Sequence, residues 1–360
     1  MKKGTGYKIG LITIGIVFLI MIAGGTAYQV WNTSDPQKTC NNCHEISPSY
    51  NTWAASAHRN FKCENCHGTA LSNGWHSLKE KTNMVFSHFS GSMIHEDIGL
   101  DEAQILETME RCRVCHQTEY FMWNSSGHSA SYADLFLNEV HNTTEQLNFD
   151  CLRCHGMFYE GTINDLVEPL SMQGPWSLLD PHKSDQPTIP CMTCHKVHSE
   201  GQPSQAPDHS SPDSIFYTRV KENKTVGFYS RHEEVHFALD QLPTPVILHG
   251  SDTIKTPDDP VYRLCVQCHA PSVWHQAGSH DDHTPIGVHE GISCATCHEK
   301  HSNFQGNSCD KCHPAISNCK LDVKAMNTSY FSASSTNNIH FVACVDCHEE
   351  GHVIANSRHP

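Results

Sequence analysis

One five-residue pattern constrains this 360-residue chain more than any other feature: two cysteines separated by two residues, followed at once by histidine, nine times over. We number these motifs 1 to 9 in chain order. Their cysteines, eighteen of the 19 in the chain, are Cys40 and Cys43, Cys63 and Cys66, Cys112 and Cys115, Cys151 and Cys154, Cys191 and Cys194, Cys265 and Cys268, Cys294 and Cys297, Cys309 and Cys312, and Cys344 and Cys347. Their histidines are His44, His67, His116, His155, His195, His269, His298, His313 and His348.

The spacing of the motif has a mechanical reason. Two thiols three positions apart can form thioethers to the two vinyl groups of one haem, and the next histidine then lies under the iron as its proximal ligand. A zinc site needs two cysteine pairs for each ion, and a disulfide framework gives no role to the histidine. The sequence therefore predicts nine covalently bound haem c groups, with one of the nine motif histidines on each iron.

Other histidines are numerous enough to give each iron a second, distal ligand, because the chain has 29 in all. Six lie within five residues of a motif, namely His58, His198, His289, His301, His340 and His352, and a seventh candidate, His128, lies downstream of motif 3. Two of these seven end a repeated Trp-x-x-Ser-x-His pattern, which begins at Trp53 and at Trp123. For each, a solvated loop histidine or a partner of a haem propionate is the alternative. Ligation by two histidines suits outer-sphere electron transfer, because it leaves no axial position for a substrate.

The density of motifs bounds the fold. Nine motifs in 360 residues leave too few residues to enclose each haem separately, so the haems are expected to pack against one another. The predicted fold class is mainly α with much irregular loop, wrapped around a packed chain of nine haems, with one N-terminal transmembrane helix. We predict a helix from Asp101 to Arg111, with Asp101 as its cap and with Ile105, Leu106 and Met109 on one face. The predicted regions are a cytoplasmic tip and anchor at 1–30, a dihaem region at 31–100, a trihaem region at 101–200, a haem-free insertion at 201–260 and a tetrahaem region at 261–360.

The N-terminus carries an apolar run from Ile9 to Tyr28, preceded by Lys2, Lys3 and Lys8. Its length suffices to cross a bilayer core of roughly 30 Å. The lysines predict a cytoplasmic N-terminus and a haem domain on the periplasmic side of a bacterial inner membrane. A cleaved signal peptide is the alternative, although the residues around Gly25 make a poor cleavage site. The formal charge of −15 argues against nucleic acid as a partner.

The first hundred residues resemble the NapC/NirT/NrfH family of membrane-anchored quinol-oxidising cytochromes. The resemblance rests on the anchor, motifs 1 and 2, Pro48, Trp53, His58 and a lysine-bearing segment at Lys79 to Lys81. It implies oxidation of a membrane quinol, menaquinol by preference, near the first haem, and transfer of electrons to a periplasmic or outer-membrane redox partner. It also implies that Lys79 or Lys81 lies by the quinol, the alternative being that either lysine contacts lipid headgroups.

This sequence departs from the family pattern at one position. Family members commonly carry methionine two residues after the first motif histidine, and some use it as an axial ligand, whereas this chain has Ile46, which cannot ligate iron. From about residue 101 onward the chain resembles multihaem cytochromes in general, including the run from His289 to Cys294. That likeness is to a fold class and identifies no reaction.

Three functions are compatible with these features. The first is an electron-transfer module from the quinol pool to periplasmic or extracellular acceptors. The second is a reductase of nitrite, hydroxylamine or tetrathionate with one five-coordinate haem, although no motif has the lysine in place of histidine that often marks such a site. The third is a subunit of a haem filament. Whether the chain is an enzyme stays open, with quinol dehydrogenase favoured over terminal reductase. Cys319, outside the motifs, is expected to be an unreactive thiol, with axial ligation as the alternative.

Overall fold

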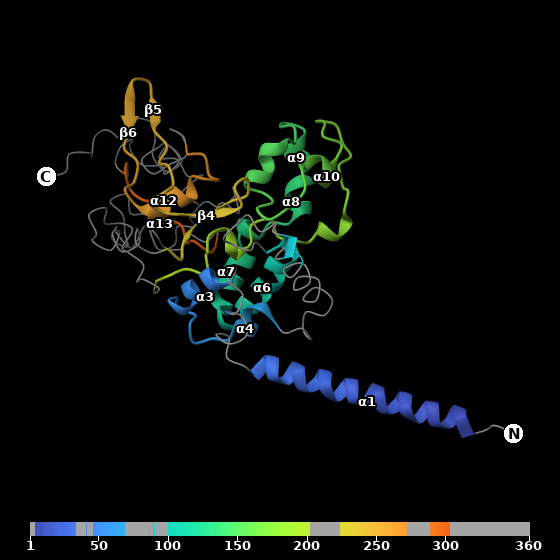
Figure 1. Ribbon diagram of the computed structural model, residues 1–360. Coiled ribbons are helices and arrows are strands. Elements are labelled where there is room, and N and C mark those ends of the chain that lie inside the picture. The colour runs from blue at the N-terminus through green and yellow to red at the C-terminus, as the bar shows by residue number, and fades with distance from the viewer. Residues whose placement is uncertain are drawn as a thin grey trace. The chain divides into compact units, whose positions relative to one another are not determined.

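The computed structural model describes residues 4–33, 41, 46–68, 86, 89–90, 100–201, 224–271 and 289–302. The chain divides into two compact units, Met1–Ile98 and Gly99–Pro360, called unit 1 and unit 2 below (Figure 1). Motifs 2 to 7 lie within the described residues, motif 2 in unit 1 and motifs 3 to 7 in unit 2. The boundaries predicted for the five regions stay predictions.

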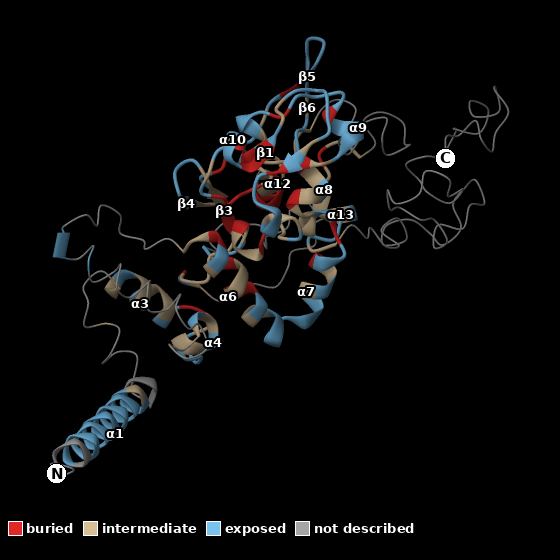
Figure 2. Cartoon of the chain, turned by 90° about the vertical axis from the view of Figure 1, so that its right-hand side faces the viewer, coloured by how far each residue is buried: buried red, intermediate tan, exposed pale blue. Residues whose placement is uncertain are grey.

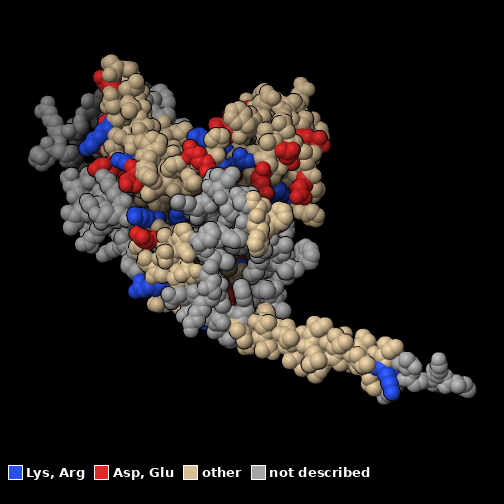
Figure 3. All heavy atoms as spheres, in the orientation of Figure 1, with Lys and Arg blue, Asp and Glu red and all other residues tan. Residues whose placement is uncertain are grey.

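Unit 1 begins with a long apolar helix, α1 (Gly4–Thr33). The most apolar part of its segment Lys8–Val30 has a mean hydropathy of 2.3, and none of that part is buried against the rest of the protein. The space-filling view shows α1 almost free of charged side chains (Figure 3). By length and composition α1 fits a single membrane span, as predicted, since a helix of about 20 apolar residues crosses a bilayer core.

Two short helices of unit 1 flank His58, a predicted distal ligand, along the chain. Helix α3 (Ser47–Ala54) has Pro48 in its first turn, where a missing N–H costs nothing. Helix α4 (Cys63–His67) consists of motif 2 itself. His58 lies on the segment between them and is half-buried.

The helices of unit 2 are short, as the motif density predicts. They are α6 (Glu102–Cys115), α7 (Gln117–Asn124), α8 (Tyr132–Phe136), α9 (Glu139–Asn142), α10 (Ile163–Leu166), α12 (Pro260–Cys265) and α13 (Cys294–Cys297), with 3₁₀ turns η1 (Gly127–Ser129), η2 (Phe149–Arg153), η3 (Pro181–Lys183) and η4 (Cys191–Thr193).

The predicted cap at Asp101 is confirmed: its carboxylate accepts from the Gln104 N–H, and the Gln104 side chain accepts from the Asp101 N–H, both at 2.9 Å. Ile105 and Met109 are buried, as predicted, and Leu106 is half-buried. The helix runs on to Cys115, so it delivers motif 3 directly.

Three antiparallel hairpins add strands to a fold that we predicted as helix and loop. They pair β1 (Val167–Glu168) with β2 (Ser177–Leu178), β3 (Gly227–Ser230) with β4 (Val235–Ala238), and β5 (Ile247–His249) with β6 (Asp252–Ile254). Two of them fall in the stretch predicted to be free of haem. There the aromatic and β-branched residues favour extended backbone. Gly250, with φ +65°, provides the turn between β5 and β6.

The buried residues of unit 2 lie on several of its short elements (Figure 2), and they form small apolar cores beside motif residues. The largest joins Tyr132, Phe136, Leu147, Leu152, Tyr159, Ile163, Leu166, Val167 and Leu178, and Cys151 of motif 4 packs against it. A second consists of Leu239, Leu242 and Val261, with Cys265 of motif 6 and Ala295 of motif 7 at its edge. A third, formed by Ile105, Met157 and Phe158, contacts Met192 of motif 5. Each core therefore fixes the backbone of at least one motif.

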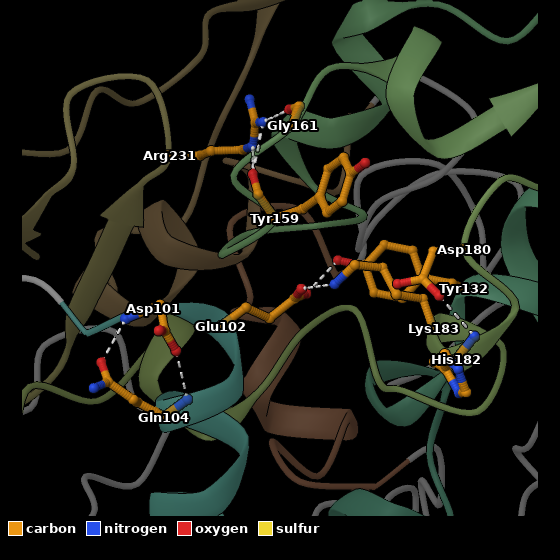
Figure 4. Close-up of polar contacts among 10 residues, drawn as sticks. All are labelled: Asp101, Glu102, Gln104, Tyr132, Tyr159, Gly161, Asp180, His182, Lys183 and Arg231. Carbon is orange, nitrogen blue, oxygen red and sulfur yellow. Dashed lines mark hydrogen bonds and ion pairs between the residues drawn. The ribbon is translucent and has the colours of Figure 1, made fainter. Parts of the chain in front are cut away.

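A buried polar cluster ties the start of α6 to α8 and η3 (Figure 4). The Glu102 carboxylate accepts a hydrogen bond from the Tyr132 hydroxyl and forms an ion pair with Lys183, and all three side chains are largely excluded from solvent. The Lys183 ammonium also lies 5.6 Å from the ring centre of Tyr132 and 5.1 Å from that of Tyr159. These contacts hold the helix that carries motif 3 against the largest core.

Candidate haem sites

The described motifs share one backbone geometry. In motifs 3 to 7 the histidine N–H donates to the carbonyl of the first cysteine, at 2.9 Å in four of them and 3.0 Å in motif 5. In motif 2 the same residues form the single turn of α4. Residues three and four positions apart on such a turn lie on one face. Both cysteines and the histidine of each motif therefore project to the same side, which is the arrangement that a haem held by two thioethers and one imidazole requires.

The motif side chains are available for such attachment. The twelve cysteines in the described part of the chain are in the thiol form and not in disulfides. Five of the six motif histidines described there keep part of their surface open to solvent, although surrounding atoms reduce the hydration of the His195 and His269 rings. His155 is half-buried, and its Nδ1 is buried without a hydrogen-bond partner. No group of three or more His, Cys, Asp or Glu that could hold a bare metal ion occurs among these residues. A porphyrin supplies four of the six iron ligands itself and needs only one or two from the protein, so the donor set fits haem.

The thiols of different motifs of unit 2 lie close enough to shift one another's pKa. Burial, with a smaller contribution from the neighbouring thiol of Cys112, raises the pKa of Cys191 to about 11. Burial, with smaller contributions from the thiols of Cys294 and Cys194, raises the pKa of Cys265 to about 12. A hydrogen bond with Cys154 is the main cause that raises the pKa of Cys268. Motif 3 thus adjoins motif 5, motif 4 adjoins motif 6, and motif 6 adjoins motifs 5 and 7.

Two motif histidines face a histidine from another part of the chain. The ring centres of His128 and His269 are 6.1 Å apart, and those of His195 and His301 are 6.0 Å apart. Burial, with smaller contributions from His301, His116 and His236, lowers the pKa of His195 to about 4. Burial likewise lowers the pKa of His128 and of His269. These imidazoles are therefore neutral near pH 7, which is the form that binds metal.

The repeated Trp-x-x-Ser-x-His pattern forms the same turn in both units. In each copy the serine N–H donates to the tryptophan carbonyl at 2.9 Å, and the serine Oγ accepts from the histidine N–H, at 3.0 Å for His58 and 3.1 Å for His128. Ser56 and Ser126 are both buried. The pattern is therefore a structural device that ends a helix and fixes the backbone of the histidine.

The comparison with known families agrees with this geometry. Residues 2–160 match the model of the N-terminal region of the NapC/NirT cytochrome c family. This part of the chain is similar to the NapC/NirT family, and we call residues 2–160 the NapC/NirT region. The match confirms the resemblance noted in the sequence and extends it past the first hundred residues, through motifs 3 and 4. No curated protein and no solved structure is similar enough to the chain to match it.

Several of the predicted site residues lie outside the residues that the structure describes, in the NapC/NirT region and beyond it. Motif 1 (Cys40, Cys43 and His44) lies outside the described residues, as do Lys79 and Lys81. Ile46, which replaces the methionine of the family, begins the turn before α3. Beyond the NapC/NirT region, motifs 8 and 9, His340, His352 and Cys319 also lie outside. His198 and His289 are described and half-buried, and their role as ligands stays a prediction.

Sequence reasoning missed two histidines near the motifs. His141, on α9 at the end of the NapC/NirT region, lowers the pKa of His155 after burial, the main cause. The Nε2–H of His236, on β4, donates to the Met192 carbonyl at 2.6 Å and so supports motif 5. Both lie ten or more residues from any motif in sequence. Their proximity depends on the packing of α9 and on the β3–β4 hairpin, so no local pattern could have indicated it.

Proposed function

We propose that this chain is a membrane-anchored cytochrome that carries nine haem c groups and transfers electrons from the quinol pool to periplasmic or extracellular acceptors. The observation that carries the proposal is the shared one-turn geometry of the described motifs, within a chain whose N-terminal region is similar to a cytochrome c family. The haems, when bound, supply one-electron redox chemistry. The 18 motif cysteines would hold them by thioethers, and the nine motif histidines would be the proximal iron ligands.

The proposed location follows from α1. Its exposed apolar surface favours a lipid environment, and the lysines before it favour an N-terminus in the cytoplasm of a bacterial cell. This orientation would put both haem-bearing units on the periplasmic side of the inner membrane. Menaquinol is the proposed donor because of the family resemblance, with Lys79 or Lys81 by the quinol. The acceptor would be a periplasmic or outer-membrane redox protein.

Close spacing of the motifs supports a carrier role. Motifs 3 and 5, 4 and 6, 5 and 6, and 6 and 7 adjoin one another in unit 2. Sites so close together favour electron hopping through the unit. The alternative, a reductase of nitrite, hydroxylamine or tetrathionate, requires one iron with an open axial position. Histidines on both sides of a porphyrin would remove that position.

Reduction by a quinol tests the proposal. The full chain, purified in detergent, should show haem reduction when a menaquinol analogue is added, and dithionite should define complete reduction. Lys79→Met and Lys81→Met variants should separate the quinol site from the haems: a lysine at the quinol site slows reduction by the quinol and leaves reduction by dithionite unchanged. A fully haem-loaded chain that menaquinol does not reduce would contradict the proposed donor. A high-spin iron together with nitrite, hydroxylamine or tetrathionate reduction would favour the enzyme.

A further inference from the structure

Two histidine pairs in unit 2 have a separation that calls for an explanation. The rings of His195 and His301 are nearly parallel, with an interplanar angle of 17°, and their centres are 6.0 Å apart. His128 and His269 are 6.1 Å apart at 60°. Within the described residues, neither pair is joined by a hydrogen bond or an ion pair. An iron between two imidazoles explains the spacing, because two metal–nitrogen bonds of about 2.0 Å, added to the ring dimensions, place the ring centres roughly 6 Å apart.

We propose that His128 and His269 are the two axial ligands of the haem attached to Cys265 and Cys268, and that His301 and His195 are those of the haem attached to Cys191 and Cys194. This assignment rests on the proposed function, since it presupposes that haem is bound. It goes further by giving two irons a definite ligand pair. Each pair joins segments far apart in sequence, so each haem cross-links the chain.

Backbone contacts position His128 and His301, the two proposed distal ligands, without any bound iron. His128 follows the turn in which Ser126 accepts its N–H, and Trp123 of the same turn donates its indole N–H to the Ile189 carbonyl at 3.0 Å. That bond fixes the turn to the segment just before motif 5. His301 lies three residues after His298 of motif 7, whose short helix α13 packs against α12 and so against motif 6.

The two sites are neighbours. Cys194 of one site contributes to the raised pKa of both Cys265 and Cys268 of the other. His301 of one site lowers the pKa of His128 of the other, after burial and His269. The two haems therefore form a close pair with both axial positions filled on each iron. Such a pair passes electrons and binds no substrate at the metal.

Removing one donor histidine tests each assignment. His128→Ala and His301→Ala leave every attachment motif intact, so mass spectrometry should show the same haem load as in the wild type. Electron paramagnetic resonance should then show one additional high-spin iron in each single variant and two in the double variant. The matched control is His182→Ala, an exposed histidine of unit 2, which should leave the spin count unchanged. An unchanged count in a fully loaded His128→Ala or His301→Ala variant would overturn the corresponding assignment.

Methionine substitutions test whether the two histidines of a pair share one iron. His128→Met and His269→Met should each convert one iron to His/Met ligation, which near-infrared magnetic circular dichroism detects. If both residues bind the same iron, the double variant has one iron with two methionine ligands and no His/Met iron. Two His/Met irons in the double variant would overturn the pairing. Loss of haem from the wild type would instead contradict the proposed function, so the two failures are distinguishable.

Discussion

At the scale of single residues, each candidate site depends on a histidine whose backbone is fixed by a few hydrogen bonds. The motif histidines are fixed by the carbonyl of their first cysteine, and His58 and His128 by a buried serine. The motif residues were predictable from sequence because attachment chemistry is local. The serine turn was predictable only as a repeated pattern, since its role depends on burial. The partner of each distal histidine was not predictable, because segments far apart in the chain supply the two rings.

The serine turn should be sensitive to loss of one hydroxyl. Ser126→Ala removes the acceptor for the His128 N–H and the donor to the Trp123 carbonyl, at 3.1 and 2.7 Å, in a buried place. We expect a destabilisation of about 1–3 kcal/mol, together with partial conversion of one iron to high spin, measured by denaturant unfolding and by electron paramagnetic resonance. Ser125→Ala is the control, because that side chain is exposed and bonds only to the Met122 carbonyl. Equal effects of the two variants would contradict this role for Ser126.

At the scale of elements, the sequence predicted the helix that delivers motif 3, because Asp101 and the spacing of Ile105 and Met109 are local signals. The β3–β4 hairpin was not predicted. Phe228 and Tyr229 are of a type that favours extended backbone, but their pairing with β4 depends on contacts with motif 5. The Gly227 N–H donates to the Cys194 carbonyl, and the Lys196 N–H donates to the Thr225 carbonyl, both at 3.0 Å. A hairpin that is stabilised by a distant motif leaves only a weak local signal.

The hairpin should tolerate no side chain at Gly227. A Cβ there would lie 2.2 Å from the Phe237 carbonyl oxygen, which is backbone on the paired strand and cannot rotate away. Gly227→Ala should therefore separate β3 from β4 and weaken the bond to Cys194, with a cost of about 1–3 kcal/mol. Ser230→Ala, at the other end of β3, should change the unfolding midpoint little. A Gly227→Ala variant as stable as the wild type would mean that the hairpin does not support motif 5.

The buried ion pair at the start of α6 should matter more than an exposed pair on the same helix. Glu102→Ala leaves the Lys183 ammonium and the Tyr132 hydroxyl without their partner in the interior. Removal of one member of a buried pair costs about 3–5 kcal/mol. Glu107→Ala is the control, because Glu107 forms a more exposed pair with Arg111 and such pairs contribute about 1 kcal/mol or less. Thermal unfolding of the loaded protein would measure both, and a smaller loss in Glu102→Ala than in Glu107→Ala would contradict the role given to the cluster.

At the scale of the whole molecule, unit 2 has small apolar cores beside closely spaced attachment motifs. The sequence predicted this arrangement from the number of motifs alone, because a chain with so few residues for each motif cannot build a separate pocket for each haem. It also predicted the apolar helix α1 and the similarity of the N-terminal region to a cytochrome c family. The order in which the motifs adjoin could not be predicted, since it is fixed by cores and hairpins that join segments far apart in the chain.

The mass of the intact mature polypeptide tests the central claim most directly. We expect an excess over the amino-acid sequence equal to nine haem groups, retained under denaturing conditions because thioethers are covalent. Peptide mapping should locate one group on each cysteine pair. A polypeptide without this excess, or one that carries zinc in its place, would contradict the account.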